Sequence, residues 1–176
     1  ALSSAASDVY KRQMQQALYS ESKLVAVRYP RGAQRAIPES IKPTFADFDV
    51  FGDENAEKAI ITYGRTFSAC AFAYEKLVNS GESVKLIKLN RIIPVCEGAV
   101  EAAKNCKDVY FFEEGIRRGG VGEGFLFDLS KAGFSGKYHL RAIENGFVKQ
   151  ASVESLLHKY GFDEEGVLSF VTSAEA

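Results

Sequence analysis

The chain has 176 residues, 46% of them hydrophobic and 26% charged, which suits one domain with a core and excludes a disordered protein. Its 22 Lys and Arg residues nearly balance 23 Asp and Glu residues, so no strong net field attracts nucleic acid or an anionic membrane. No apolar run has the length of a membrane-spanning helix, and the start lacks the apolar core of a secretory signal. Three cysteines without a C-x-x-C pair are typical of a reducing compartment, so we expect a cytoplasmic protein.

The N-terminal segment differs in character from the rest of the chain. Residues 8–13 (DVYKRQ) read like a translated transposon end, so residues 1–13 are interpreted as a non-native leader, the alternative being a polar, frayed terminus. Residues 24–29 form a compact β-rich run ended by a proline and a glycine, which predicts a buried strand and a turn. Residues 33–44 contain two prolines and no periodicity, which predicts a surface linker.

From residue 45 onward the pattern predicts alternating strands and helices. Residues 45–51 alternate apolar and polar side chains, which indicates a half-exposed edge strand. The later strands are expected at 58–63, 83–89, 109–112 and 138–143, and the helices at 66–79, 95–105, 119–131, 152–160 and 164–172. Ser152 and Asp163 are the expected N-caps of the last two helices. The alternation predicts an α/β fold, an open and mostly parallel sheet with helices on both faces and residues 45–51 as an antiparallel edge strand.

Five local patterns occur in the order in which one known family has them. They are AVRYPRG at 26–32, AIITYG at 59–64, KLNRIIP at 88–94, VYFFEEG with GGVG within 109–122, and GFDEEG at 161–166. Together they resemble the C-terminal portion of the 1-deoxy-D-xylulose-5-phosphate synthases, thiamine-diphosphate enzymes of the transketolase family. The resemblance implies that residues 14–44 are a remnant of the pyrimidine-binding domain with its linker, and that residues 45–176 are a transketolase-type C-terminal domain.

The resemblance also implies what the complete enzyme does. Members of this family join pyruvate to glyceraldehyde 3-phosphate on the way to isoprenoid precursors, and thiamine diphosphate, held with Mg²⁺, carries the two-carbon unit. In the family the cofactor lies between two earlier domains, and this sequence has no G-D-G motif for diphosphate and metal. We therefore expect no catalytic residue, cofactor or metal in this chain, and no activity of the chain alone. Its expected partners are the remaining domains of the same enzyme and a second copy in a homodimer, to which it adds contact area.

The resemblance implies a contact with the phosphate of the aldehyde substrate. Arg28 matches the first arginine of the family's R-Y-P-R-G block, and a guanidinium can pair with two phosphate oxygens. The alternative for Arg28 is an ion pair with a local carboxylate at a strand end. The family's second arginine lies four residues before a strand-terminal proline, which is Asn90 here, whereas Arg91 falls one place later. Because neighbouring residues of a strand face opposite sides, Arg91 takes that role only if a bulge turns it.

The glycine-rich segment 119–124 also resembles part of a dinucleotide-binding fingerprint. Gly120 and Gly122 fit the pattern, and Glu144 lies at the spacing of a ribose-binding acid. The third glycine position is Phe125, however, so close packing of a helix N-terminus against the sheet is the favoured interpretation.

The remaining chemically capable side chains form no catalytic set. Glu113 and Glu114 are neighbours on a strand and point apart, so we expect one of them to face a helix N-terminus or Arg117. His139 and His158 have no second ligand at metal spacing. The cysteines, Cys70, Cys96 and Cys106, lack a nearby histidine base, and Cys70 is expected in the core.

Two other functions remain compatible with these patterns. The C-terminal half of a transketolase or of a 2-oxoacid dehydrogenase β subunit would share the fold, so fold alone does not separate them. A non-catalytic α/β module that binds a nucleotide or mediates assembly is the alternative from a different class. Thermal stabilisation by nucleotides would favour that module.

Overall fold

A computed structural model describes residues 18–19, 35–44, 46–144 and 146–173 of the chain. The chain divides into two compact units, Ala1–Ala36 and Ile37–Ala176, and the fold below is that of the second. The strand expected at 24–29 lies outside the described residues. None of the helices in the described part of the chain is long and apolar enough to cross a membrane.

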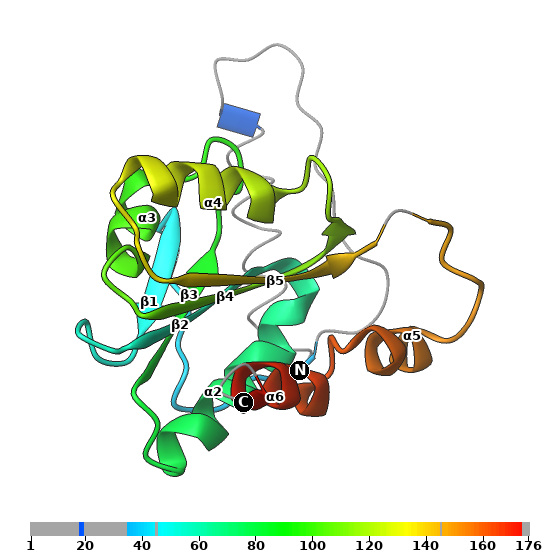
Figure 1. The fold of residues 1–176 in the computed structure, drawn as a ribbon. Helices are drawn as coiled ribbons and strands as arrows, with labels where there is room; N and C mark the ends of the chain where they lie inside the picture. Colours follow the sequence, from blue (N-terminus) through cyan, green and yellow to red (C-terminus); the bar gives the residue numbers. More distant parts are fainter. Residues whose placement is uncertain (1–17, 20–34, 45, 145, 174–176) are drawn as a thin grey trace. The chain divides into compact units, whose positions relative to one another are not determined.

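The second unit is built on a five-stranded sheet with the order β1-β3-β2-β4-β5 (Figure 1). The strands are β1 (Phe48–Phe51), β2 (Lys58–Tyr63), β3 (Val84–Leu89), β4 (Asp108–Ile116) and β5 (Lys137–Ile143). β1 pairs antiparallel with β3, and all other neighbours are parallel. The predicted sheet, with its single antiparallel edge strand, is therefore confirmed.

Helices cover both faces of the sheet, as predicted (Figure 1). They are α2 (Phe67–Asn79), α3 (Glu97–Ala103), α4 (Val121–Lys131), α5 (Val153–Tyr160) and α6 (Glu164–Ser173), and a short 3-10 turn, η1 (Gly64–Thr66), precedes α2. α2 and α6 pack on one face, and α3 and α4 on the other. The helix expected at 95–105 is shorter than predicted because Val95 still bridges to Ile92 and Cys96 is extended.

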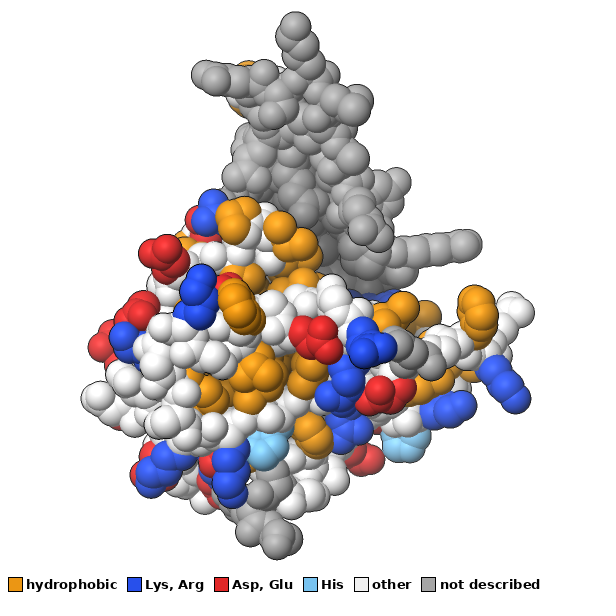
Figure 2. Space-filling view, turned by 45° about the horizontal axis from the view of Figure 1, so that its top comes forward, with side chains coloured by type: hydrophobic (Ala, Val, Ile, Leu, Met, Phe, Trp, Pro, Cys, Tyr) orange, Lys and Arg blue, Asp and Glu red, His pale blue; other side chains and the backbone are white. Residues whose placement is uncertain are grey.

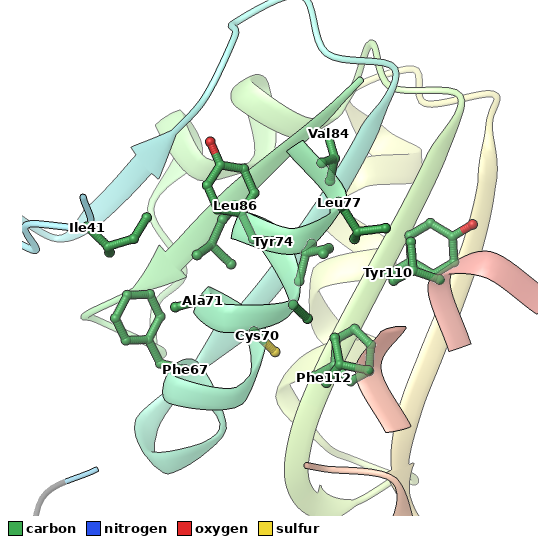
Figure 3. Packing of buried hydrophobic residues seen from close by; sticks show 14 residues of the cluster. Ile41, Phe67, Cys70, Ala71, Tyr74, Leu77, Val84, Leu86, Tyr110 and Phe112 are labelled. Carbon is green, nitrogen blue, oxygen red and sulfur yellow. The ribbon is translucent and has the colours of Figure 1, made fainter. Parts of the chain in front are cut away.

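Each face has its own core because alternate residues of a strand point to opposite sides. On the α2 side, Ile60, Leu86 and Tyr110 come from three adjacent strands and share one cluster with Phe67, Tyr74 and Leu77 of α2. Figure 3 shows Leu86 and Tyr110 with these three side chains of α2. On the other side, Ile61, Ile87, Phe111 and Phe125 belong to the second cluster. The central strand β2 is buried on both faces, which is why residues 59–61 read as a continuous apolar run. Burying each large side chain stabilises the fold by roughly 1.5–3 kcal/mol.

The antiparallel edge strand β1 departs from simple alternation. Asp49 is buried, whereas Val50 of the same strand is 37% exposed. The Asp49 carboxylate is tolerated there because it accepts hydrogen bonds from the Thr44 hydroxyl at 2.6 Å, the Thr44 backbone N–H at 3.0 Å and the Asn90 amide at 2.9 Å. The start of β1 is thus fastened to the end of β3 by polar contacts.

Capping interactions define the two C-terminal helices. The Ser152 hydroxyl accepts from the Ser155 N–H at 3.2 Å, and the Asp163 carboxylate accepts from the Gly166 N–H at 2.9 Å, so both predicted N-caps are confirmed. His158 Nδ1 lies 2.6 Å from the second oxygen of Asp163. The hydrogen bond with Asp163 and its negative charge raise the pKa of His158. Burial acts to raise the pKa of Asp163, but the hydrogen bond with His158 outweighs it and the pKa of Asp163 is lowered.

We expect the His158–Asp163 pair to give this helix junction a pH dependence. The pKa of His158 in the folded state should exceed its ordinary value of 6.5, and the pair's stabilisation should be lost as the pH rises through that pKa. Asp163→Asn should return the pKa of His158 to its ordinary value, and its side-chain oxygen should still cap α6. Asp163→Ala should return the pKa of His158 in the same way and, because the cap is lost, should also lower the free energy of unfolding by about 1 kcal/mol. NMR titration of the His158 ring with urea unfolding checks this, and an unchanged pKa in Asp163→Asn would contradict it.

Candidate functional site

The candidate site lies where the strand order of the sheet reverses. The chain moves from β2 to β3 on one side of β2, and then to β4 on the other side. In open α/β sheets, ligands bind outside the carboxyl ends of the strands at such a reversal. The residues to consider are therefore those at the ends of β2 and β4 and at the start of α4.

Glu113 of β4 occupies this position. Its side chain is buried, with 1% exposed. One oxygen, Oε2, accepts a hydrogen bond from the Val121 N–H at 2.9 Å and another from the Tyr63 hydroxyl at 3.1 Å. The other oxygen, Oε1, has no hydrogen-bond partner in the described part of the chain. Glu113 therefore joins the end of β2, the middle of β4 and the first turn of α4.

Burial governs the ionisation of this cluster. It raises the pKa of Glu113, while the nearby N–H groups of Gly122 and Val121 and the Tyr63 hydroxyl favour the ionised form. Burial, with the negative charge of Glu113 added, also raises the pKa of Tyr63. The N-terminus of a helix favours a negative charge, which explains why a carboxylate is held there. A side chain so enclosed fastens the helix to the sheet and is not presented to a substrate.

The glycine-rich turn makes room for this carboxylate. A Cβ at Gly120 would collide with Oε1 of Glu113 and would lie 2.6 Å from the carbonyl oxygen of Ile116. A Cβ at Gly122 would lie 2.5 Å from the Leu140 side chain. The Gly122 carbonyl accepts a hydrogen bond from Tyr138 at 2.7 Å, which ties α4 to β5 as well. The close-packing interpretation of these glycines is therefore favoured over the dinucleotide fingerprint.

The second glutamate of the pair points away from the first, as expected. Glu114 forms a two-pronged ion pair with the Arg65 guanidinium, in which Arg65 Nε lies 3.1 Å from Oε2. β4 is longer than predicted and contains both glutamates, because Ile116 pairs again with Ile143 of β5 after an irregularity in register that follows Phe112. Neither Tyr63 nor Arg65 was anticipated as a partner, because each is about 50 residues away in sequence.

The two positions considered for the second phosphate contact lie just beyond the end of β3, where strand alternation no longer applies. The Asn90 amide donates to the Ala46 carbonyl and to Asp49, each at 2.9 Å, so its side chain is turned inward. Arg91 is 47% exposed and lies 3.2 Å from Asp47. Arg91 therefore presents a positive charge at the surface, whereas the neutral amide of Asn90 is engaged within the fold. Arg28 lies outside the described residues.

The other residues singled out from the sequence are scattered over the fold. His139 lies 2.9 Å from Asp108 and stacks on Tyr110, whereas His158 contacts Asp163 on the surface. Cys70 is buried, which raises the pKa of its thiol to about 12, so it is an inert core residue. Glu144 accepts from Arg117 at 2.7 Å, so it is not a free ribose ligand.

The described residues do not fit thiamine diphosphate or its metal ion. Among them, no group of three or more histidine, cysteine or acidic side chains could hold a metal. The N-terminus of α4, which could otherwise accept a diphosphate, already holds the Glu113 carboxylate. We derive no catalytic step through the cofactor from these residues.

Comparison with known proteins gives a consistent result. Residues 52–167 match the family model described as "Transketolase, C-terminal domain". The chain is similar to the 1-deoxy-D-xylulose-5-phosphate synthase of Shouchella clausii, with 25% identity over 152 residues that cover 85% of this chain and 24% of the relative. It is 30% identical over 146 residues to the synthase of Caldanaerobacter subterraneus, and the match covers 81% of this chain and 23% of the relative. The chain thus spans about a quarter of the length of these relatives.

Solved structures share the fold. A protein described as "Split gene transketolase, inactive beta4 tetramer" has a TM-score of 0.64 and 21% identity over 78% of this chain and 45% of that one. The transketolase of Campylobacter jejuni has a TM-score of 0.58 and 12% identity, over 79% of this chain and 20% of that one. At these identities the likeness is evidence for the fold alone.

We expect two glycines four residues apart to respond oppositely to alanine. Gly120→Ala should destabilise the fold by about 1–3 kcal/mol, because its Cβ enters the space of Glu113. Gly124→Ala should stabilise it by up to about 1 kcal/mol, because that helical position has open space around it and alanine favours helix. Urea unfolding of both variants measures this, and equal effects would contradict the tight packing of the turn.

A second prediction concerns the charge on Glu113. Because its folded pKa is raised above the ordinary value of 4.5, the folded state binds that proton more tightly. Wild type should therefore gain stability relative to Glu113→Gln as the pH falls from 7 through the folded pKa. Glu113→Ala should cost about 1–3 kcal/mol, because the Val121 N–H and the Tyr63 hydroxyl lose their acceptor.

Urea unfolding between pH 4 and pH 7 provides the measurement for Glu113. Glu97→Gln is the matched control, because Glu97 is exposed in the first turn of α3. The control should change stability by less than about 0.5 kcal/mol. A stability difference between wild type and Glu113→Gln that does not vary with pH would show that the carboxyl is not held with a raised pKa.

Proposed function

This chain belongs to the transketolase C-terminal domain family, and on that premise we propose that it is the C-terminal portion of a thiamine-diphosphate-dependent 1-deoxy-D-xylulose-5-phosphate synthase. The complete enzyme would join pyruvate to glyceraldehyde 3-phosphate. Its cofactor and Mg²⁺ would be bound by the upstream domains, which the relatives' greater length leaves room for. The chain itself would contribute structure and contact area.

One observation carries the structural role. The crevice at which open α/β sheets bind ligands is filled by the chain's own Glu113 and Tyr63, which hydrogen bond at 3.1 Å. A fold whose ligand-binding edge is closed in this way is suited to packing against other domains. We further propose that the enzyme is a homodimer and that it lies in the cytoplasm. The three free cysteines favour this reducing compartment.

Within this function, Arg28 and Arg91 are the proposed contacts to the substrate phosphate. Arg28 is proposed from the R-Y-P-R-G block alone. Arg91 is supported by its place beyond β3 and its exposed guanidinium, whose contact with Asp47 at 3.2 Å is a surface ion pair that phosphate could replace. Asn90 is the weaker candidate, because its amide is engaged by Ala46 and Asp49.

The test is to supply the complete protein that contains this chain with pyruvate, glyceraldehyde 3-phosphate, thiamine diphosphate and Mg²⁺. We expect 1-deoxy-D-xylulose 5-phosphate in the product mass spectrum. Arg28→Ala and Arg91→Ala should each raise the KM for glyceraldehyde 3-phosphate by about 10- to 100-fold, as expected for a lost charged hydrogen bond. With unphosphorylated glyceraldehyde as acceptor, both variants should match wild type.

Arg118→Ala is the matched control, because Arg118 is an exposed arginine in the turn before α4. It should leave both acceptors unaffected. Absence of the product from the complete protein would refute the proposed reaction, whereas unchanged KM values in the arginine variants would refute only the phosphate contacts. Micromolar binding of thiamine diphosphate to the isolated chain would contradict the assignment of cofactor binding to the upstream domains.

A further inference from the structure

An open cavity of about 550 Å³ lies at the end of β5. It is lined by the last residues of β5, the segment that follows them, the end of α5 and one side chain of α6. Figure 1 shows β5 leading into this segment and α5 on the right of the molecule. The volume falls in the range of small-molecule sites, roughly 300–1,000 Å³.

The charges that line the cavity are mostly positive. Arg117, Arg141 and Lys159 face one acidic side chain, Glu144. Glu144 is engaged by Arg117, whose Nε lies 2.7 Å away, and Arg117 also donates to the Leu140 carbonyl at 2.9 Å. Arg141 and Lys159 have no anionic partner among the described residues. Figure 2 shows Lys and Arg side chains gathered on the right of the molecule, with acidic and hydrophobic side chains among them.

Arg141 is the unusual member of this group. Its guanidinium lies 4.2 Å from the centre of the Phe170 ring, which orients it without neutralising it. Its Nε is buried and has no hydrogen-bond partner in the described part of the chain. Burial, and then the charge of Arg117, lower the pKa of Arg141. A partly buried cation without an anion is costly, so the missing component of this group is a negative charge.

Gly161 keeps the space beside this guanidinium open. It has a φ of +69° at the end of α5, and a Cβ at this position would lie 3.0 Å from Arg141 Nη1. The guanidinium thus lies over the ring of Phe170 and close to Gly161. Both come from the C-terminal helices, so Arg141 is positioned by elements distant in sequence.

The rim of the cavity is apolar and aromatic. Phe147 is fully exposed and Val148 is 42% exposed, although both line the cavity. The Lys159 ammonium group lies over the Tyr160 ring, with its Nζ 5.4 Å from the centre of that ring. Exposed aromatic side chains around a charged pocket fit a ligand that has an apolar body and a charged end.

We propose that this cavity binds a small organic phosphate, with the phosphate on Arg141 and Lys159 and a flat or apolar body against Phe147 and Tyr160. A phosphate monoester carries about −1.5 to −2 charges at neutral pH, which matches the two cations that have no anionic partner in the described part of the chain. The forked donors of arginine suit phosphate oxygens, and lysine adds a point charge. This site is independent of the proposed reaction.

Phenyl phosphate is the probe for a test by calorimetric titration and by NMR of backbone amides in the full chain. We expect saturable binding, with shift changes centred on Gly146, Lys159 and Gly161. Arg141→Met keeps an unbranched side chain over Phe170 and should weaken binding at least about tenfold, as expected for loss of a charged hydrogen bond. Arg118→Met is the matched control and should bind as wild type does.

Two further comparisons separate the parts of the ligand. Phe147→Ala should weaken the binding of phenyl phosphate but not that of inorganic phosphate, and phenol should not bind. Benzoate binding as tightly as phenyl phosphate would overturn the assignment to phosphates. No saturable binding, equal binding by Arg141→Met, or shift changes remote from the cavity would overturn the site. The shift map uses wild type alone, so it decides the question even if Arg141→Met fails to fold.

Discussion

The architecture of the sheet's carboxyl edge depends on one buried carboxylate at the start of a helix. Glu113 is held by the Val121 N–H and the Tyr63 hydroxyl, so α4, β4 and β2 meet at a single side chain. The positive end of the helix offsets part of the cost of burying a charge there. Glycine at position 120 follows from this contact, because any Cβ would occupy the space of the carboxylate.

This contact distinguishes the fold from open α/β proteins that bind a ligand at the same place. In many open α/β proteins the same place is a ligand crevice, and the helix N-terminus accepts a phosphate. Here the protein supplies its own anion, so the glycine-rich turn closes this part of the sheet's edge. A closed edge agrees with a domain that packs against others, and with relatives about four times as long in which it forms only one part.

The charge on Arg141 has a different environment from that on Glu113. The Glu113 carboxylate accepts hydrogen bonds from two other elements, β2 and α4, whereas Arg141 rests on an aromatic ring and its Nε has no hydrogen-bond partner among the described residues. The difference follows from their positions, because β4 is covered on both sides whereas β5 is an edge strand beside an open cavity. The charge on Glu113 is thus met in part within the fold, whereas the proposed ligand would meet the charge on Arg141.

The sequence by itself determined the class of fold, the order of strands and helices, both C-terminal caps and the family. These depend on local periodicity, on capping side chains and on short motifs, all of which are readable along the chain. Only the tertiary structure decided which of Glu113 and Glu114 turns inward, that Arg91 is exposed while the Asn90 amide is engaged, and that Asp49 is buried. The physical reason is that each outcome depends on partners far away in sequence, Tyr63 for Glu113 and Asn90 for Asp49. Such contacts leave no periodic signal, because the pairing of strands and the packing of helices bring them together.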